Sequence, residues 1–482
     1  MGVLRFIQAA CLTYLLWLPV SQQSTLFAVL GVLAASSLAI GFTHRLRWTK
    51  PFSRVWLLLT IATALTLLVG SIRGTPGWNH QLLVWGGGLV IWSLWARSIS
   101  KESIRPLLIL LTTGVFAVSS LMALYALGQL GYLPAVIPDS VMTTQQAGFA
   151  SNYDGSNIRF LSVSTLAAGG PLVIGGLFVG RDPLLPPRWL IGAAALAALI
   201  AAALAGRRAI LLVCVTAPFV SWALQWLFRD RKRSVRIHPL LLLGGSLVLG
   251  GGLLALGTDG AGRAVAVARD AVSLYLGAGT SGTDKAIAND GVRTVQAGEL
   301  LNGWAQSPLF GSGAGGVLDS GFYRSEERPW QFELQYHQLL FNGGLVGVLV
   351  VVAASLLALV AIRRVATSHP CHRGVLVMAA AAGFSLLVAN ASNPYLSADG
   401  HWWGVALIVG VANALNREGR VRQVARERRM GQTAVPVASC QVVPSNQTGL
   451  DRVVSEICAP LPVVTTEGRE SIANPPASDL LK

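Results

Sequence analysis

Charged residues are scarce in this sequence, since Asp, Glu, Lys and Arg make up 12% of its 482 residues while 53% are hydrophobic. Soluble domains carry about 25% charged residues, so the composition excludes an ordinary soluble globular fold. A stretch of about 20 apolar residues crosses the hydrocarbon core of a membrane as one helix. The composition therefore predicts an all-α polytopic membrane protein.

Twelve apolar stretches are candidates for such spans, which gives about 12 transmembrane helices. The stretches are 4–20, 24–42, 54–72, 80–97, 106–128, 160–180, 189–205, 209–228, 239–257, 338–362, 374–393 and 401–416. No small-residue cleavage site follows the first stretch, and the second begins almost at once. We therefore interpret the first stretch as a helix and not as a signal peptide.

Acidic residues are missing from all twelve stretches. Membrane carriers often bury charges at mid-membrane and consist of two similar six-helix halves. The longest loop of this chain instead lies between the ninth and tenth stretches. These features therefore argue against a membrane carrier, such as a transporter of lipid-linked oligosaccharides.

Cysteine is also rare, with five residues in the chain, and these five show no metal-ligand spacing. Cys371, Cys440 and Cys458 fall in segments that we assign to the cytoplasm, where thiols stay reduced. The first outer loop, "SQQS" at 21–24, also holds no acid that could bind a metal. We predict no metal and no cofactor.

Basic residues are numerous by contrast, with 37 Lys and Arg against 22 acids and a net charge of +15. With the amino terminus in the cytoplasm, the short inner loops hold seventeen basic residues and the short outer loops hold four. This asymmetry agrees with the positive-inside rule. The charge therefore reflects membrane topology, and we predict membrane lipids but no nucleic acid as partners.

This topology divides the chain into four parts. They are spans one to nine (1–257), a large extracytoplasmic loop or cap between helices 9 and 10 (258–336), spans ten to twelve (337–416) and a basic, largely disordered cytoplasmic tail (417–482). The tail opens with "NREGRVRQVARERRM", which predicts a basic helix attracted to anionic lipid. The rest of the tail lacks helical periodicity.

The cap contains a predicted helix and a glycine-rich loop. The helix begins near Asn289 or Asp290 and is stopped by Pro308. The loop "PLFGSGAGG" satisfies G-x-G-x-x-G, but the strand and helix that a dinucleotide site needs are absent from the prediction. We interpret it as a flexible loop that offers backbone N–H groups to an anion, or as a simple turn.

Two proton-transfer groups precede the tenth span. Glu333 and His337 are separated by four residues, so on a helix they would share one face near the outer membrane boundary. They are candidates for a general base. The alternative is that both are ordinary interface residues that anchor the helix end.

One set of arginines lies outside in this topology, against the rule that governs the inner loops: Arg159, Arg207, Arg208 and Arg293. Guanidinium groups stay charged and bind phosphate through two hydrogen bonds. A cluster of them beside a membrane pocket suits the pyrophosphate of a lipid-linked substrate. The alternative for each is contact with phospholipid headgroups.

Three segments in this order resemble the bacterial O-antigen ligases and the related Wzy-type O-antigen and exopolysaccharide polymerases. They are "LAGRRAILL", "GVRTVQAGELLNGWAQSPLFGSGAGG" and "QLLFNGGLVG". The resemblance covers the sixth to the eleventh span. This chain departs from the ligases at one position. In the ligases, a His usually stands eleven residues before the first Gly of the G-x-x-G motif. Here that position is Glu333, counted from Gly344, and His337 lies one helical turn too close. A carboxylate there favours the polymerases.

The resemblance implies a metal-independent transfer of glycan from a polyprenyl-pyrophosphate donor to an acceptor sugar hydroxyl, on the periplasmic face of the inner membrane. Glu333 or His337 would then be the base. The pyrophosphate would be bound by Arg207, Arg208, Arg293 and Arg159. The alternative is an O-antigen ligase, whose acceptor is the lipid A core, and a chain-length regulator would be a further partner of a polymerase.

Overall fold

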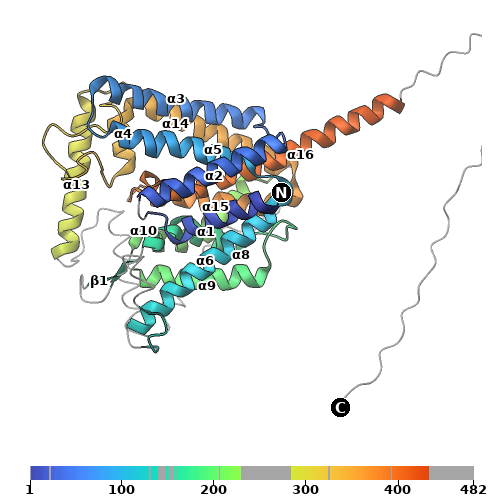
Figure 1. The fold of residues 1–482 in the computed structure, drawn as a ribbon, viewed down its shortest axis with the longest axis horizontal. Helices are drawn as coiled ribbons and strands as arrows, with labels where there is room; N and C mark the ends of the chain where they lie inside the picture. The colour runs from blue at the N-terminus through green and yellow to red at the C-terminus, as the bar shows by residue number, and fades with distance from the viewer. Residues whose placement is uncertain are drawn as a thin grey trace, which may run out of the picture. The chain divides into compact units, whose positions relative to one another are not determined.

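The computed structural model of the chain describes residues 2–20, 23–129, 132–138, 148–150, 157–159, 161–205, 207–229, 284–323, 326–391 and 393–433. This part of the chain is helical apart from one antiparallel pair of short strands (Figure 1). Strand β1 (Gly148–Ala150) pairs with strand β2 (Asn157–Arg159), with Gly148 opposite Arg159.

The α-helices are α1 (Gly2–Trp17), α2 (Gln23–Thr43), α3 (Lys50–Arg73), α4 (Trp78–Gln81), α5 (Gly88–Ser98), α6 (Lys101–Gln129), α8 (Leu166–Leu177), α9 (Arg188–Leu204), α10 (Arg208–Leu227), α13 (Asp284–Ala305), α14 (Gln335–Ser368), α15 (Arg373–Ala389) and α16 (Trp403–Thr433). The shorter elements are the π-helix η1 (Leu82–Gly87) and the 3-10 helices η2 (Leu161–Thr165), η3 (Pro370–His372), η4 (Tyr395–Ser397) and η5 (Asp399–His401).

Six of the described helices are long and apolar enough to cross a membrane: α2, α3, α6, α10, α14 and α15. Three more, α1, α8 and α9, are apolar but shorter. These are the properties of a helical membrane protein. The count of twelve spans and the large loop between the ninth and tenth remain predictions, and the ninth stretch, 239–257, lies outside the described residues.

Helix α8 forms the centre of the core. Each of its residues from Leu166 to Gly176 is buried, and it packs against α9, α10 and α15. Its glycines let the neighbouring helices approach closely. A side chain at Gly175, for example, would collide with Ser221 and Ala381.

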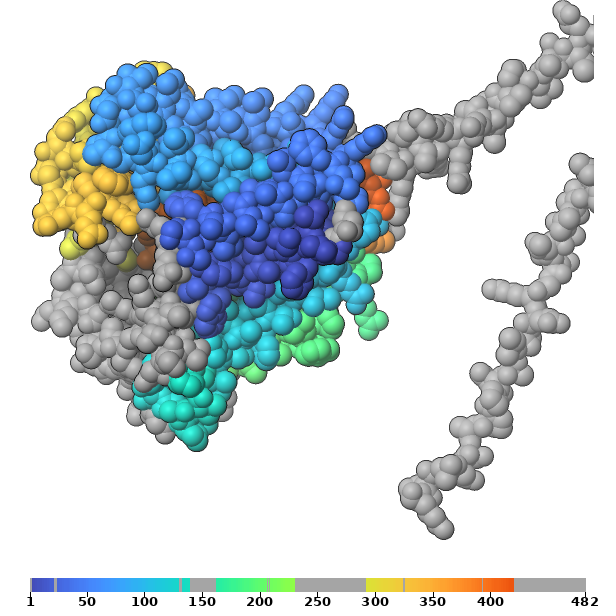
Figure 2. Space-filling model, viewed as in Figure 1, coloured from blue at the N-terminus to red at the C-terminus, as the bar shows by residue number. Residues whose placement is uncertain are grey.

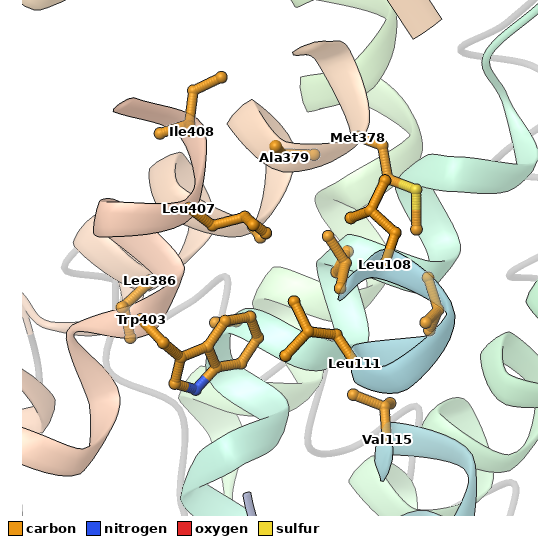
Figure 3. Packing of buried hydrophobic residues seen from close by; sticks show 14 of the residues in the cluster. Leu108, Leu111, Val115, Met378, Ala379, Leu386, Trp403, Leu407 and Ile408 are labelled. Carbon is orange, nitrogen blue, oxygen red and sulfur yellow. The ribbon is translucent and has the colours of Figure 1, made fainter. Parts of the chain in front are cut away.

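The core continues between α6, α15 and α16. Figure 3 shows the ring of Trp403 in α16 facing Leu111 of α6, with Leu386 of α15 beside Trp403. All three side chains are almost completely buried. Helix α16 therefore belongs to the bundle in its first part, and the basic stretch of the predicted tail continues the same helix to Thr433.

Helix α13 lies at one end of the bundle, where α1, α3, α9 and α15 end and α8, α10 and α14 begin. Figure 2 shows its yellow atoms, and those of the loop after it, beside the blue atoms of α3 and α4. Arg73, at the end of α3, donates a hydrogen bond of 2.9 Å to the carbonyl of Gly311. We call this region the α13 end.

The opposite end carries basic residues of the predicted inner loops. Arg417 donates to the carbonyl of Arg97 at 3.0 Å, and Lys101 pairs with Glu418 at 2.8 Å. Cations at helix C-termini satisfy carbonyl groups that the helix itself leaves unpaired. These basic residues thus lie at the end of the described bundle opposite the α13 end, and the compartment that each end faces stays a prediction.

The glycine-rich loop after α13 packs backbone against backbone. Gly313, at a φ of +88°, lies so close to Gly70 of α3 that a Cβ atom would stand 2.3 Å from its nitrogen. The amides of Ser312, Gly313 and Ala314 donate to the carbonyls of Phe341, Asn342 and Thr66. The expectation that this loop is flexible and offers N–H groups to an anion is therefore wrong, because the protein itself uses these groups.

Helix α14 is interrupted where this loop meets it. Gly344 has φ +61° and ψ −170°, outside the helical region. The next two amides, of Leu345 and Val346, donate to the carbonyls of Pro308 and Leu309 at 2.9 and 3.0 Å. The loop thus caps the longer part of α14. Among the described helices, α14 and α3 form the most extensive helix pair.

Candidate functional site

The candidate site lies at the α13 end, where Arg207 faces the link between α15 and α16. Arg207 is the N-cap residue of α10 and is exposed. Its guanidinium interacts with the side chain of Tyr395, which is only 4% exposed. Burial raises the pKa of Tyr395, while the positive charges of Arg207 and Arg293 act in the opposite direction. Arg207 therefore contacts this buried hydroxyl, while Arg293 affects it only weakly, through its charge.

His401 packs on Tyr395 from the same link. The two rings meet edge to face, with centroids 5.7 Å apart and planes at 67°. Burial lowers the pKa of His401 to about 4, and the charge of Arg207 acts in the same direction. At neutral pH the imidazole is therefore uncharged, and it supports the phenol ring as a neutral aromatic group.

The link between α15 and α16 is held by side chains from several elements. The side-chain oxygen of Asn390 accepts the amide of Leu396 at 2.9 Å, and Gln335 of α14 accepts the hydroxyl of Ser397. The indole of Trp92 in α5 donates to the carbonyl of Asp399 at 2.7 Å. These bonds fix the backbone on both sides of Tyr395, so its ring is positioned rigidly.

Arg293 is ion-paired with Glu333. Its Nε atom lies 2.7 Å from a carboxylate oxygen, and the two side chains are 34% and 19% exposed. One turn later on α13, the buried Gln296 accepts the amides of Glu333 and Leu334 at 3.0 and 3.1 Å. Helix α13 therefore holds the segment before α14 through two residues on one face.

Glu333 and His337 are not on one helix, so the expectation that they share a helical face is wrong. Helix α14 begins at Gln335, and Leu334 has a non-helical ψ of 84°. The reason is tertiary: the amides of Glu333 and Leu334 are bound by Gln296 of α13. His337 is half-buried in the first turn of α14. The role of either residue as a base stays a prediction.

The other two predicted arginines are described only by their backbone. Arg208 is the first residue of α10, and Arg159 ends strand β2. Their side chains lie outside the described part of the structure. Of the four predicted phosphate ligands, the structure thus brings Arg207 and Arg293 toward a common group, Tyr395.

Three residues of this site were missed from the sequence: Tyr395, Asp399 and His401. They lie in "NPYLSADGHWW" at 393–403, of which the span assignment treats 394–400 as a short connection and places His401 at the start of the twelfth stretch. The side-chain oxygen Oδ1 of Asp399 is buried without a hydrogen bond, and burial raises the pKa of this carboxyl to about 8. A dense run of polar and aromatic residues inside apolar sequence is the signal that could have indicated a site.

Within the described residues, no three His, Cys, Asp or Glu side chains lie close enough together to hold a metal ion. No family model matches the chain, and a search of curated proteins finds no match. The resemblance to ligases and polymerases therefore rests on the sequence segments quoted above, and the function below is argued from the geometry of the α13 end.

Proposed function

We propose that the chain is a membrane polysaccharide polymerase that transfers glycan from a polyprenyl-pyrophosphate donor to an acceptor sugar hydroxyl at the α13 end. The observation that carries this proposal is the placement of Arg207 beside the buried Tyr395, at the same end of the bundle as the ion pair between Arg293 and Glu333. Two cations beside a carboxylate, at one end of an apolar helical bundle, match the charges of this reaction.

The reaction needs a cation and a base at separate points. The acceptor oxygen attacks the anomeric carbon, the bond from that carbon to the pyrophosphate oxygen breaks, and pyrophosphate leaves with the electron pair. Developing negative charge on the leaving group is stabilised by guanidinium groups held in place beforehand. The proton of the acceptor hydroxyl passes to a general base.

Arg207 is suited to hold the leaving group, since no ion pair engages it among the described residues and its side chain is exposed. Arg293 shares its charge with Glu333. For Glu333 to accept a proton, Arg293 has to turn from the carboxylate toward the donor phosphate. Donor binding would then release Glu333 from its ion pair with Arg293, so that it can act as the base. His337 needs no such release, because it makes no ion pair in the described part of the chain.

The test compares single variants in cells of the source organism that lack the chromosomal gene. We expect Arg207→Ala to shorten or abolish the polymer, and Arg207→Lys not to restore it, because lysine lacks the two-pronged geometry. Loss of the true base reduces the rate by about 10²–10⁴, so Glu333→Gln and His337→Ala should differ sharply. The readouts are the glycan chain-length distribution and the amount of protein in the membrane.

Arg364→Ala is the matched control, because Arg364 is an exposed arginine in α14 far from the α13 end. It should leave the polymer unchanged. Normal polymer from Arg207→Ala, or from both Glu333→Gln and His337→Ala, would contradict the proposal. Cells in which deletion of the gene leaves polymer intact but removes glycan from the lipid A core would identify a ligase instead.

A further inference from the structure

We propose that Tyr395 is a phosphate-binding residue, whose hydroxyl donates to a phosphate oxygen of the donor that Arg207 holds from the outside. The inference deepens the proposed function and rests on it. Tyr395 lies on η4, in the link between α15 and α16, and was assigned no role by the sequence.

The first argument is the state of the hydroxyl. Tyr395 is 4% exposed, and its hydroxyl donates no hydrogen bond within the described residues. A buried phenol normally finds a partner, because an unmade hydrogen bond is costly. The contrast is Tyr336, at the same end, whose hydroxyl donates to the carbonyl of Leu387 at 2.6 Å.

The second argument is the charge around the hydroxyl. The group beside it is the guanidinium of Arg207, and the charge of Arg293 reaches it as well. The hydroxyl oxygen can accept from the guanidinium of Arg207, but its own proton then has no acceptor among the described residues. An anion placed between them would accept from all of these groups, and a phosphate has enough oxygen atoms to do so.

The third argument is rigidity. His401 packs against the ring of Tyr395, and the backbone on either side is fastened by Asn390 and Trp92. Sites that bind a ligand precisely are held by such supporting contacts. The link thus holds one hydroxyl beside Arg207 without depending on the ligand for its shape.

The experiment uses the full chain, purified in detergent, with inorganic pyrophosphate as the probe in titration calorimetry. Tyr395→Phe removes only the hydroxyl and keeps the ring on His401. We expect pyrophosphate to bind about 10-fold more weakly, the usual effect of losing one hydrogen bond to a charged group. The change should not add independently to that of Arg207→Ala, because both residues hold one ligand. Tyr323→Phe, at an exposed tyrosine of the same end, should bind as the wild type does.

Thermal midpoints separate a binding role from a structural one. Tyr395→Phe should unfold no earlier than the wild type, whereas Tyr336→Phe should unfold earlier because it loses the bond to Leu387. An early-melting Tyr395→Phe would show that the hydroxyl is structural and overturn the inference. Weak binding by Arg207→Ala with normal binding by Tyr395→Phe would overturn it too, and leave the proposed function standing. Normal binding and normal polymer in Arg207→Ala would defeat both.

Discussion

Gly344→Ala is the most direct test of how the α13 end is packed, because the Cβ atom of alanine would clash with the glycine-rich loop. Its backbone, at φ +61° and ψ −170°, is a conformation that is nearly restricted to glycine. A Cβ atom would stand 2.4 Å from the carbonyl oxygen of Leu309 and 2.5 Å from the nitrogen of Gly311. Both atoms belong to backbone, so the loop itself has to move.

The expected cost of Gly344→Ala follows from these contacts. Backbone strain contributes about 1–3 kcal/mol. Displacing the loop also breaks the bonds from Leu345 and Val346 to the loop carbonyls, at about 1 kcal/mol for each. The total is about 3–5 kcal/mol, enough to lower the thermal midpoint clearly in detergent and to reduce polymer synthesis.

Gly347→Ala is the matched control, three residues further along the same helix. A Cβ atom there meets only the hydroxyl oxygen of Thr66, at an ordinary 3.7 Å. Replacing a helical glycine by alanine stabilises a helix by about 1 kcal/mol, so the midpoint should stay or rise. Equal midpoints for the two variants would refute the reasoning, since they would show that the interruption of α14 is not required.

Two further changes test the neighbouring contacts. Gln296→Met leaves the amides of Glu333 and Leu334 without their acceptor, so the free energy of unfolding should fall by about 1–3 kcal/mol. Val295→Ala, on the exposed face of α13, is the control and should change this free energy little. For Asp399, a folded pKa of about 8 lies above the unfolded value of about 3.9, so stability is lost as pH rises between these two values. Asp399→Asn should therefore raise the thermal midpoint over the wild type increasingly from pH 4.5 to pH 8; a constant difference across that range would refute the assignment.

Much of the helical framework could be predicted from the sequence, because long apolar stretches have one structural solution in a membrane. The stretches 54–72 and 106–128, for example, fall within α3 and α6. The stop before Pro308 is also confirmed, since α13 ends at Ala305. Its start at Asp284 comes earlier than the capping residues near Asn289 indicate.

The site could be predicted only in part, because its geometry depends on contacts between distant segments. Arg207 and Arg293 were found because they break the charge rule. Nothing in the spacing of Tyr395 shows that it lies beside Arg207, since that neighbourhood exists only once α10 and the α15–α16 link have packed. The prediction that Glu333 and His337 share a helical face was wrong because it, too, ignored a contact between distant segments. Gln296 of α13 binds the amides of Glu333 and Leu334, and α14 begins only at Gln335.

The packing of α3 against α14 also has a consequence for biosynthesis. Roughly 260 residues separate Arg73 from Gln335, and at about 5–20 residues per second the ribosome needs tens of seconds to make them. During that interval α3 is without its main partner, and the carbonyl of Thr66, which later accepts the amide of Ala314, lacks that donor. The α13 end therefore cannot be completed until α14 has been synthesised, because both the main partner of α3 and the loop that binds it come from this later part of the chain.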